Sequence, residues 1–171
     1  MYTEQNLVRI AKRENNQKRK YLVVNRLQGK HIPVKPYEAL AMFQALANQV
    51  QGHYQQETLL VIGFAETATA IGAAVAVALN ADYIQTTREL IPNVAYLYFS
   101  EEHSHATEQK LVKDDIDCAV KTIDRILFVE DEVTTGKTIQ NIVDILRKQY
   151  AKKIKFSVAS VLNGMNQDAL D

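Results

Sequence analysis

The sequence has little cysteine, no net charge and no long apolar run, and each of these absences excludes a class of protein. Its 171 residues contain one cysteine, Cys118, which excludes an internal disulfide and a multi-cysteine metal site. Lysine plus arginine number 20, as do aspartate plus glutamate, so no whole-molecule field points to nucleic acid or a membrane. Apolar runs such as residues 70–79 are far below the ~20 residues of a membrane span, and no charged-then-apolar leader opens the chain. These absences favour a soluble, cytoplasmic protein.

The composition that remains is that of one soluble domain with an uneven distribution of charge. Hydrophobic residues make up 47% of the chain and charged residues 23%, and this length suffices to bury a single core. Residues 1–30 contain eight lysines and arginines against two glutamates. Such a patch can attract a polyanion, but a solvated face is the commoner reason for it. We therefore do not expect nucleic acid or a membrane as a partner.

Alternating strand and helix signals predict an α/β fold. Short β-type runs at 21–24 and 31–34, joined through residues 28–30, predict a small element that is either hairpin-like or irregular. Pro36 then opens a helix that runs to residue 50. Beyond it we expect strands at 58–62, 83–86, 94–99, 125–129 and 154–162, and helices at 67–79 and 138–150. This order predicts a mostly parallel central sheet flanked by helices, with a core of residues 36–171 and an N-terminal element of residues 1–35.

Three segments lie where such a sheet binds ligands, beyond the carboxyl ends of its strands. They are residues 63–69, the stretch from Thr86 into the polar run 100–109, and residues 130–138. We therefore expect the functional residues in these three segments.

The strongest signal is RILFVEDEVTTGKT, residues 125–138. A buried strand would deliver Glu130 and Asp131 to its carboxyl end. A polar turn then leads into a helix, and this threonine turn consists of Thr134, Thr135, Gly136, Lys137 and Thr138. Free N–H groups at a helix N-terminus favour an anion, and adjacent carboxylates can accept hydrogen bonds from neighbouring sugar hydroxyls. A phosphate on one side and a diol on the other describe a ribose 5-phosphate.

The tail Gly136-Lys137-Thr138 also matches the end of a P-loop. That motif needs a glycine five residues before its Gly-Lys pair. Asp131 stands at this position, and its carboxylate would repel the phosphates. We therefore reject a nucleotide triphosphatase loop.

The segment resembles the signature of the type I phosphoribosyltransferases, which is an apolar strand, two acidic residues, two variable positions and Thr-Thr-Gly-x-Thr. Residues 130–138 match it position by position, with Glu132 and Val133 at the variable positions. The resemblance implies the type I phosphoribosyltransferase fold, with residues 1–35 as a hood-like element. It also implies that Glu130 and Asp131 bind the ribose hydroxyls of 5-phosphoribosyl-1-pyrophosphate (PRPP), while the threonine turn binds the 5-phosphate.

The implied reaction transfers phosphoribose to a nitrogenous, base-like acceptor and releases pyrophosphate, a step of nucleotide metabolism. Mg2+ would bridge pyrophosphate and ribose oxygens with few protein ligands, as is usual for this ion, so no metal site made by the protein alone is expected. The acceptor is not identified by the sequence, because the hood that binds it varies within the family.

The resemblance also assigns roles in the other two segments. The family's pyrophosphate loop falls on residues 63–69, which implies binding through Gly63, Phe64, Ala65, Glu66, Thr67 and Thr69. Glu66 is an unusual neighbour for pyrophosphate. Arg88 is the candidate basic residue for the pyrophosphate, and a surface ion pair is the alternative.

A loop that closes over the active site falls on residues 99–109 in this family. His103 or His105 could there protonate or orient the leaving pyrophosphate; a zinc site of this pair lacks further ligands at metal spacing. The family's loop usually carries a lysine near its start, whereas the nearest one here is Lys110, at the far end. This departure leaves the catalytic assignment open.

A narrower resemblance is to the orotate phosphoribosyltransferase-like proteins of bacterial tellurite-resistance and stress gene clusters. It is carried by residues 29–34, 63–69 and 99–109. For Lys30 and His31 it implies a place in the hood, and an ordinary surface position is the alternative. Those proteins generally continue into a further C-terminal domain. A homodimer is a further expectation.

Two other functions are compatible with parts of this sequence. One is a regulatory module of the same fold that senses PRPP without transferring phosphoribose, with nucleic acid as a conceivable ligand of its basic N-terminus. The other, a synthetase that makes the donor, is disfavoured because the chain is too short for paired domains.

Overall fold

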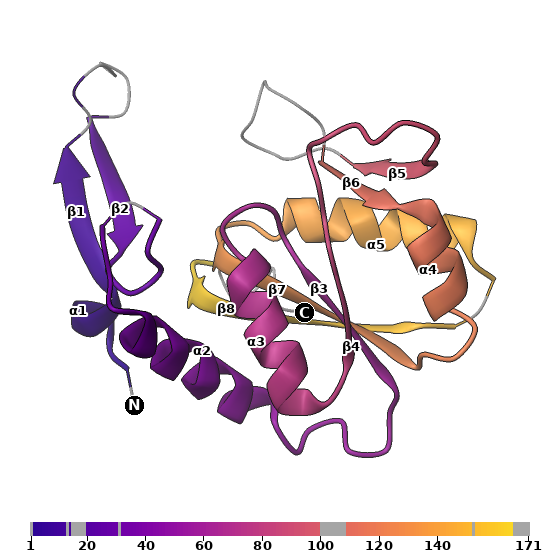
Figure 1. Cartoon of the computed structure of the whole chain (residues 1–171), viewed down its shortest axis with the longest axis horizontal. Coiled ribbons are helices and arrows are strands. Elements are labelled where there is room, and N and C mark those ends of the chain that lie inside the picture. The colour runs from indigo at the N-terminus through magenta and orange to yellow at the C-terminus, as the bar shows by residue number, and fades with distance from the viewer. Residues whose placement is uncertain are drawn as a thin grey trace.

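A four-stranded parallel sheet forms the centre of the computed structural model, which describes residues 2–12, 14, 20–30, 32–99, 109–151 and 153–165. The strands are β3 (Leu59–Gly63), β4 (Asp82–Gln85), β7 (Arg125–Val133) and β8 (Lys155–Asn163), and they lie in the order β4-β3-β7-β8 (Figure 1). All five residues of β3 are buried, as expected for a strand with neighbours on both edges and helices on both faces. The predicted α/β architecture with a mostly parallel sheet is confirmed.

Two hydrophobic cores lie on the two faces of this sheet, because successive side chains of a strand point to opposite faces. Leu60 and Ile62 of β3 belong to one core, with α5 (Lys137–Gln149) and α4 (Lys113–Ala119). Val61 belongs to the other core, with α2 (Pro36–Val50) and α3 (Thr69–Leu79). The apolar periodicity of residues 137–149 is that of a helix with one buried face, through Ile142, Val143 and Leu146.

A short antiparallel pair extends the first of these cores. It consists of β5 (Tyr96–Phe99) and β6 (Gln109–Val112). An isolated bridge between Thr87 and Lys110 connects the pair to the end of β4. This arrangement brings the residues after β4 close to the start of β6.

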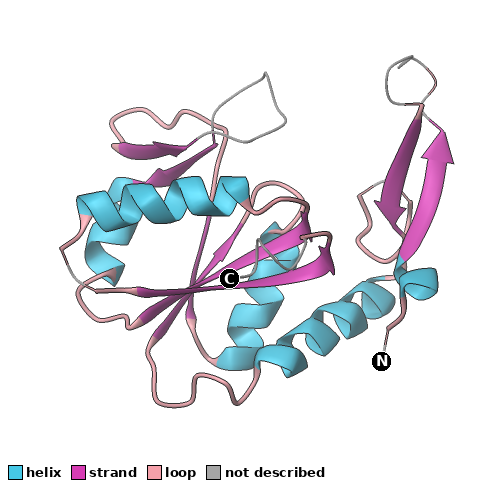
Figure 2. Cartoon of the chain, turned by 180° about the vertical axis from the view of Figure 1, so that it is seen from behind, coloured by secondary structure: helices cyan, strands magenta, loops and turns pink. Residues whose placement is uncertain are grey.

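The N-terminal element is a hairpin that stands apart from the sheet (Figure 2). It consists of α1 (Glu4–Leu7), β1 (Val8–Lys12) and β2 (Tyr21–Asn25), and the two strands are antiparallel. Of the two forms expected for residues 21–34, a hairpin between 21–24 and 31–34 is wrong: β2 pairs with β1, and the described residues 32–35 carry no strand. The physical reason is Pro33, which has no N–H to donate to a ladder.

Other boundaries also differ from the predictions. The strand predicted to end at residue 129 continues to Val133, because Glu130, Glu132 and Val133 still pair with β8. Helix α3 begins at Thr69 rather than at residue 67, and α1, β1, β6 and α4 had no strong periodic signal. Among the described residues, no helix combines the length and apolarity needed to cross a bilayer.

Candidate active site

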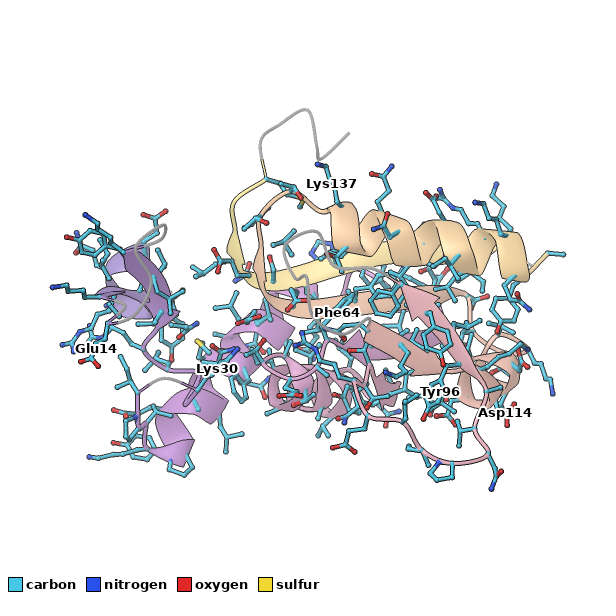
Figure 3. All side chains as sticks on the ribbon, turned by 90° about the horizontal axis from the view of Figure 1, so that it is seen from above. Glu14, Lys30, Phe64, Tyr96, Asp114 and Lys137 are labelled. Carbon is cyan, nitrogen blue, oxygen red and sulfur yellow. The ribbon has the colours of Figure 1, made fainter. Side chains whose placement is uncertain are left out.

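Segments that are distant in sequence meet at the carboxyl edge of the sheet. They are the residues after β2, the loop 63–69, the residues after β4, and the end of β7 with the threonine turn. Figure 3 labels one residue of three of these segments, Lys30, Phe64 and Lys137. The edge is therefore the place at which the predicted donor-binding residues come together.

Asp131 is the most highly connected carboxylate of this edge. One of its oxygens accepts a hydrogen bond from the Thr67 hydroxyl at 3.0 Å, and the other accepts one from the Gln28 amide at 2.8 Å. Burial acts to raise the pKa of Asp131, but hydrogen bonds with Glu130, Gln28 and Thr67 and the charge of Lys30 outweigh it and lower the pKa below its ordinary value. The carboxylate is therefore ionised at neutral pH.

The residues on either side of Asp131 lie in different environments. Glu130 is half-buried, and its side chain accepts a hydrogen bond from the Asp131 backbone at 3.3 Å. Burial, followed by the charge of Asp131, raises the pKa of Glu132. The Val133 side chain is buried and its carbonyl accepts a hydrogen bond from Gly164 at 2.7 Å, so any ligand contact at this predicted substrate-binding position would go through the backbone.

The threonine turn has the shape of an anion site at the start of a helix. Gly136 has a φ of 77° and precedes α5 directly, and its carbonyl accepts the first helical hydrogen bond from Gln140 at 2.9 Å. Thr134, Thr135 and Lys137 are exposed and Thr138 is half-buried. The first N–H groups of a helix have no partner within the helix and can donate to a phosphate. Here the N–H of Lys137, the first of them, donates a long hydrogen bond of 3.4 Å to the Thr135 hydroxyl.

The first residues of the loop 63–69 fix it to the central sheet and to the hydrophobic core. The Phe64 backbone donates to the Val129 carbonyl at 3.1 Å, and the Phe64 ring packs against Phe99 and Phe128. Gly63, Phe64 and Ala65 are buried, whereas Glu66 is exposed. Any ligand contact of Phe64 would therefore go through its backbone.

The Ala65 peptide is held by two buried polar side chains. Its N–H donates to the Thr86 hydroxyl at 2.7 Å, and its carbonyl accepts from the Gln109 amide at 2.7 Å. The Thr86 hydroxyl in turn donates to the Gln109 side-chain oxygen, which closes a ring of three hydrogen bonds. The sequence placed Gln109 only at the end of the predicted loop 99–109, and no pattern singled out its side chain, because an isolated glutamine at the edge of a polar run is ordinary.

Arg88 and Lys110 are connected through the main chain. The Lys110 ammonium donates to the Arg88 carbonyl at 2.9 Å and lies 5.9 Å and 6.0 Å from the ring centres of Tyr96 and Tyr98. Only 5% of Lys110 is exposed. Its ammonium group therefore serves to hold the Arg88 backbone in place. His103, His105 and His31 lie outside the described residues.

The carboxylates of the edge also bear on the expected Mg2+. In the part of the chain that the structure describes, no three His, Cys, Asp or Glu side chains gather as a metal cluster. Glu130 and Asp131 offer hard oxygen ligands in adjacent positions, which suit an ion that takes one or two carboxylates together with phosphate oxygens. The residues present fit Mg2+ in that mode.

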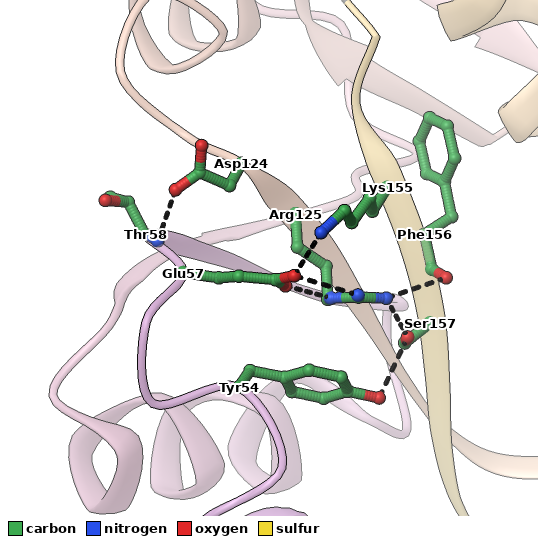
Figure 4. Close-up of polar contacts among 8 residues, drawn as sticks. All are labelled: Tyr54, Glu57, Thr58, Asp124, Arg125, Lys155, Phe156 and Ser157. Carbon is green, nitrogen blue, oxygen red and sulfur yellow. Dashed lines mark hydrogen bonds and ion pairs between the residues drawn. The ribbon is translucent and has the colours of Figure 1, made fainter.

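A second polar cluster lies at the opposite edge of the sheet (Figure 4). Arg125 makes two hydrogen bonds to the Glu57 carboxylate, at 2.5 Å and 3.2 Å, and Lys155 makes one at 2.6 Å. A cavity of about 480 Å³ lies beside it, lined by residues of 50–59 and 78–82. The cluster joins three segments of the chain at the amino ends of the strands, away from the residues described above.

Comparison with known proteins agrees with this arrangement. A family model described as "Phosphoribosyl transferase" matches residues 7–171. No curated protein matches the chain. Adenine phosphoribosyltransferase from Rhodothermus marinus superposes with a TM-score of 0.59 at 16% identity, covering 93% of this chain and 95% of that one.

Two further solved structures are similar in fold. The enzyme from Giardia lamblia, complexed with 9-deazaadenine, gives a TM-score of 0.61 at 13% identity over 95% of this chain and 96% of that one. The enzyme from Trypanosoma brucei, in complex with AMP, pyrophosphate and ribose-5-phosphate, gives a TM-score of 0.57 at 11% identity. The match covers 95% of this chain and 80% of that one. At these identities the likeness establishes the fold.

Proposed function

The chain belongs to the phosphoribosyl transferase family, and we propose that it transfers phosphoribose from PRPP to a nitrogenous, base-like acceptor with release of pyrophosphate. The observation that carries the proposal is the contact between Asp131 and Thr67 at 3.0 Å. It joins the acidic end of β7 to the loop 63–69, which are the two segments expected to hold the ribose and the pyrophosphate. The specific donor and the acceptor class follow from the sequence resemblance.

The donor would be bound along the carboxyl edge. Glu130 and Asp131 accept hydrogen bonds from the ribose hydroxyls, which an ionised Asp131 can do at neutral pH. The threonine turn takes the 5-phosphate at the N-terminus of α5. The loop 63–69 and Arg88 take the pyrophosphate, and Lys110 fixes the backbone from which the Arg88 side chain extends.

Catalysis would consist of holding the donor rigidly while charge develops on the leaving pyrophosphate. The edge itself is rich in carboxylates, with Glu66 and Glu132 in addition to Glu130 and Asp131. An anionic ligand therefore needs positive charge here, and bound Mg2+ would supply it by neutralising pyrophosphate oxygens. We assign protonation or orientation of the leaving group to His103 or His105.

The narrower assignment rests on residues 29–34, 63–69 and 99–109. We propose that the chain is an orotate phosphoribosyltransferase-like protein of the tellurite-resistance and stress type, active in the cytoplasm as a homodimer, with residues 1–35 as the hood over residues 36–171. An acceptor screen with orotate, adenine, other bases and small amines would test this assignment against an adenine-specific enzyme.

Donor binding and pyrophosphate release test the proposal directly. Titration of the protein with PRPP and Mg2+ in a calorimeter should show binding to the wild type and none to the double variant Asp131→Asn, Thr135→Ala. Asp144→Asn, at an exposed position of α5, is the matched control and should bind as the wild type does. Wild-type protein that fails to bind PRPP would refute the proposal.

Pyrophosphate release in the acceptor screen separates transfer from sensing. Release that requires both PRPP and one acceptor identifies the transferase. Tight PRPP binding without release for any base or amine would instead identify the regulatory module.

A further inference from the structure

The amide of Gln28 lies between two segments of the donor site, although it belongs to the N-terminal element. Its nitrogen donates to the Asp131 carboxylate at 2.8 Å and to the Thr67 carbonyl at 3.0 Å. The nitrogen and oxygen of an amide are assigned from their partners. Because both partners here are acceptors, the NH2 group must face them, and the orientation of this amide is determined by chemistry.

The position of Gln28 is set by the hairpin rather than by the sheet. The Arg26 backbone donates to the Leu7 carbonyl at 2.7 Å, and the Leu27 backbone donates to the buried Asn25 side chain at 2.8 Å. Leu27 packs against the core formed with α2 and α3. These contacts connect α1 and the end of β2 to the residue that reaches Asp131.

We propose that Gln28 is a positioning residue, which orients the Asp131 carboxylate for the ribose hydroxyls and couples the N-terminal element to donor binding. Each carboxylate oxygen has two acceptor positions, so the amide and Thr67 can hold Asp131 while the ribose binds. Coupling of two sites is reciprocal, so bound donor also restrains the hairpin. The inference rests on the proposed function, because it assigns a partner to the residue that would hold the ribose.

Removal of the amide should weaken donor binding. In Gln28→Ala, we expect the Kd and the KM for PRPP to rise by about tenfold, as for a lost hydrogen bond to a charged group, while kcat changes much less. The matched control is Gln44→Ala, since Gln44 on the exposed side of α2 hydrogen-bonds only to Asn48 among the described residues. The control should bind PRPP as the wild type does.

Replacing the amide of Gln28 by a carboxylate distinguishes a positioning role from a general loss of structure. In Gln28→Glu, a carboxylate faces two acceptors at pH 7, so PRPP should bind more weakly than to Gln28→Ala. The neighbouring Asp131 charge raises the pKa of such a glutamate. Between pH 7 and about 5 it should become protonated, donate to Asp131, and bring binding up to or above that of Gln28→Ala at the same pH.

Protection from trypsin tests the coupling in the other direction. PRPP with Mg2+ should slow cleavage after Arg26 and Lys30, which are both exposed, in the wild type and in Gln44→Ala but not in Gln28→Ala. Equal protection in all three proteins, or tighter PRPP binding by Gln28→Ala, would overturn the inference. Wild-type protein without PRPP binding would refute the proposed function itself, so the two failures are distinguishable.

Discussion

The carboxylates at the end of β7 show how neighbouring residues acquire different properties from their surroundings. Asp131 is ionised because hydrogen bonds and the charge of Lys30 outweigh its burial. The pKa of Glu132 is raised, first by burial and then by the negative charge of Asp131. An ionised carboxylate accepts stronger hydrogen bonds than a neutral carboxyl group, so the lowered pKa of Asp131 suits its proposed role as an acceptor for the ribose hydroxyls.

Thr86 is the residue on which the geometry of the loop 63–69 depends most directly. In Thr86→Val, which keeps the shape but removes the hydroxyl, the Ala65 N–H loses its acceptor and the Gln109 side-chain oxygen loses a donor. We expect a loss of about 1–3 kcal/mol in the free energy of unfolding, the usual cost of leaving buried polar groups unpaired. Urea denaturation measures this loss.

The control for this variant is Thr122→Val. Thr122 is exposed, and its hydroxyl donates only a 3.3 Å hydrogen bond to the Ala119 carbonyl among the described contacts. Its stability should change by less than about 0.5 kcal/mol. PRPP binding should weaken in Thr86→Val alone, and unchanged binding there would show that the ring of hydrogen bonds does not shape the loop.

Elements with a buried apolar pattern could be predicted from the sequence, and elements defined by polar contacts could not. β3 and α5 were evident from a continuous apolar run and from a 3.6-residue period. The last residues of β7 are acidic, and only their pairing with β8 makes them a strand. The threonine turn was identified from residue types alone, whereas Gln28 reaches Asp131 across 103 positions of sequence, a contact that no local pattern encodes.

The contact between α3 and β3 depends on two glycines. A Cβ atom on Gly72 would lie 2.9 Å from the Gly63 Cα and 2.9 Å from the Tyr83 ring. In Gly72→Ala we therefore expect the helix to be pushed away from the strand, at a cost of about 1–3 kcal/mol in the free energy of unfolding. The start of α3 carries the loop 63–69, so PRPP binding should weaken as well.

Gly164→Ala is the matched control for this prediction. A Cβ atom there meets nothing closer than the Val133 carbonyl, at 3.4 Å, so its stability should stay close to that of the wild type. Chemical denaturation of both variants gives the comparison. If Gly72→Ala is as stable as the control, the close approach of α3 to β3 is not needed.

At the scale of the whole molecule, the two edges of the sheet differ in their polar contacts. The carboxyl edge holds the residues proposed to bind the donor, whereas at the amino edge Glu57 pairs with Arg125 and Lys155. The guanidinium carbon of Arg125 lies 4.2 Å from the centre of the Tyr54 ring. The same guanidinium donates hydrogen bonds to the Glu57 carboxylate and the Ser157 hydroxyl (Figure 4). This cluster ties β7 and β8 to the segment before β3.

The amino-edge cluster should make the stability of the whole fold depend on pH in the acid range. Hydrogen bonds from Arg125, then from Lys155, lower the pKa of Glu57 from 4.5 to about 2. A carboxyl whose pKa is lower in the folded protein stabilises the fold above its unfolded pKa, and this contribution is lost as pH falls through the folded value. It should therefore be complete at pH 6 and disappear between pH 4.5 and about 2.

Glu57→Gln isolates this contribution. At pH 7 the variant should unfold at lower urea concentration than the wild type, because Arg125 and Lys155 keep their charges but lose the carboxylate. As pH falls from 4.5 towards 2, the wild type should lose stability faster than the variant, and the gap between the two should narrow. Glu38→Gln, at the start of α2 and without a described ion pair, controls for the general effect of acid. A gap between wild type and Glu57→Gln that stays constant from pH 7 to pH 2 would show that the ionised Glu57 does not stabilise the amino edge.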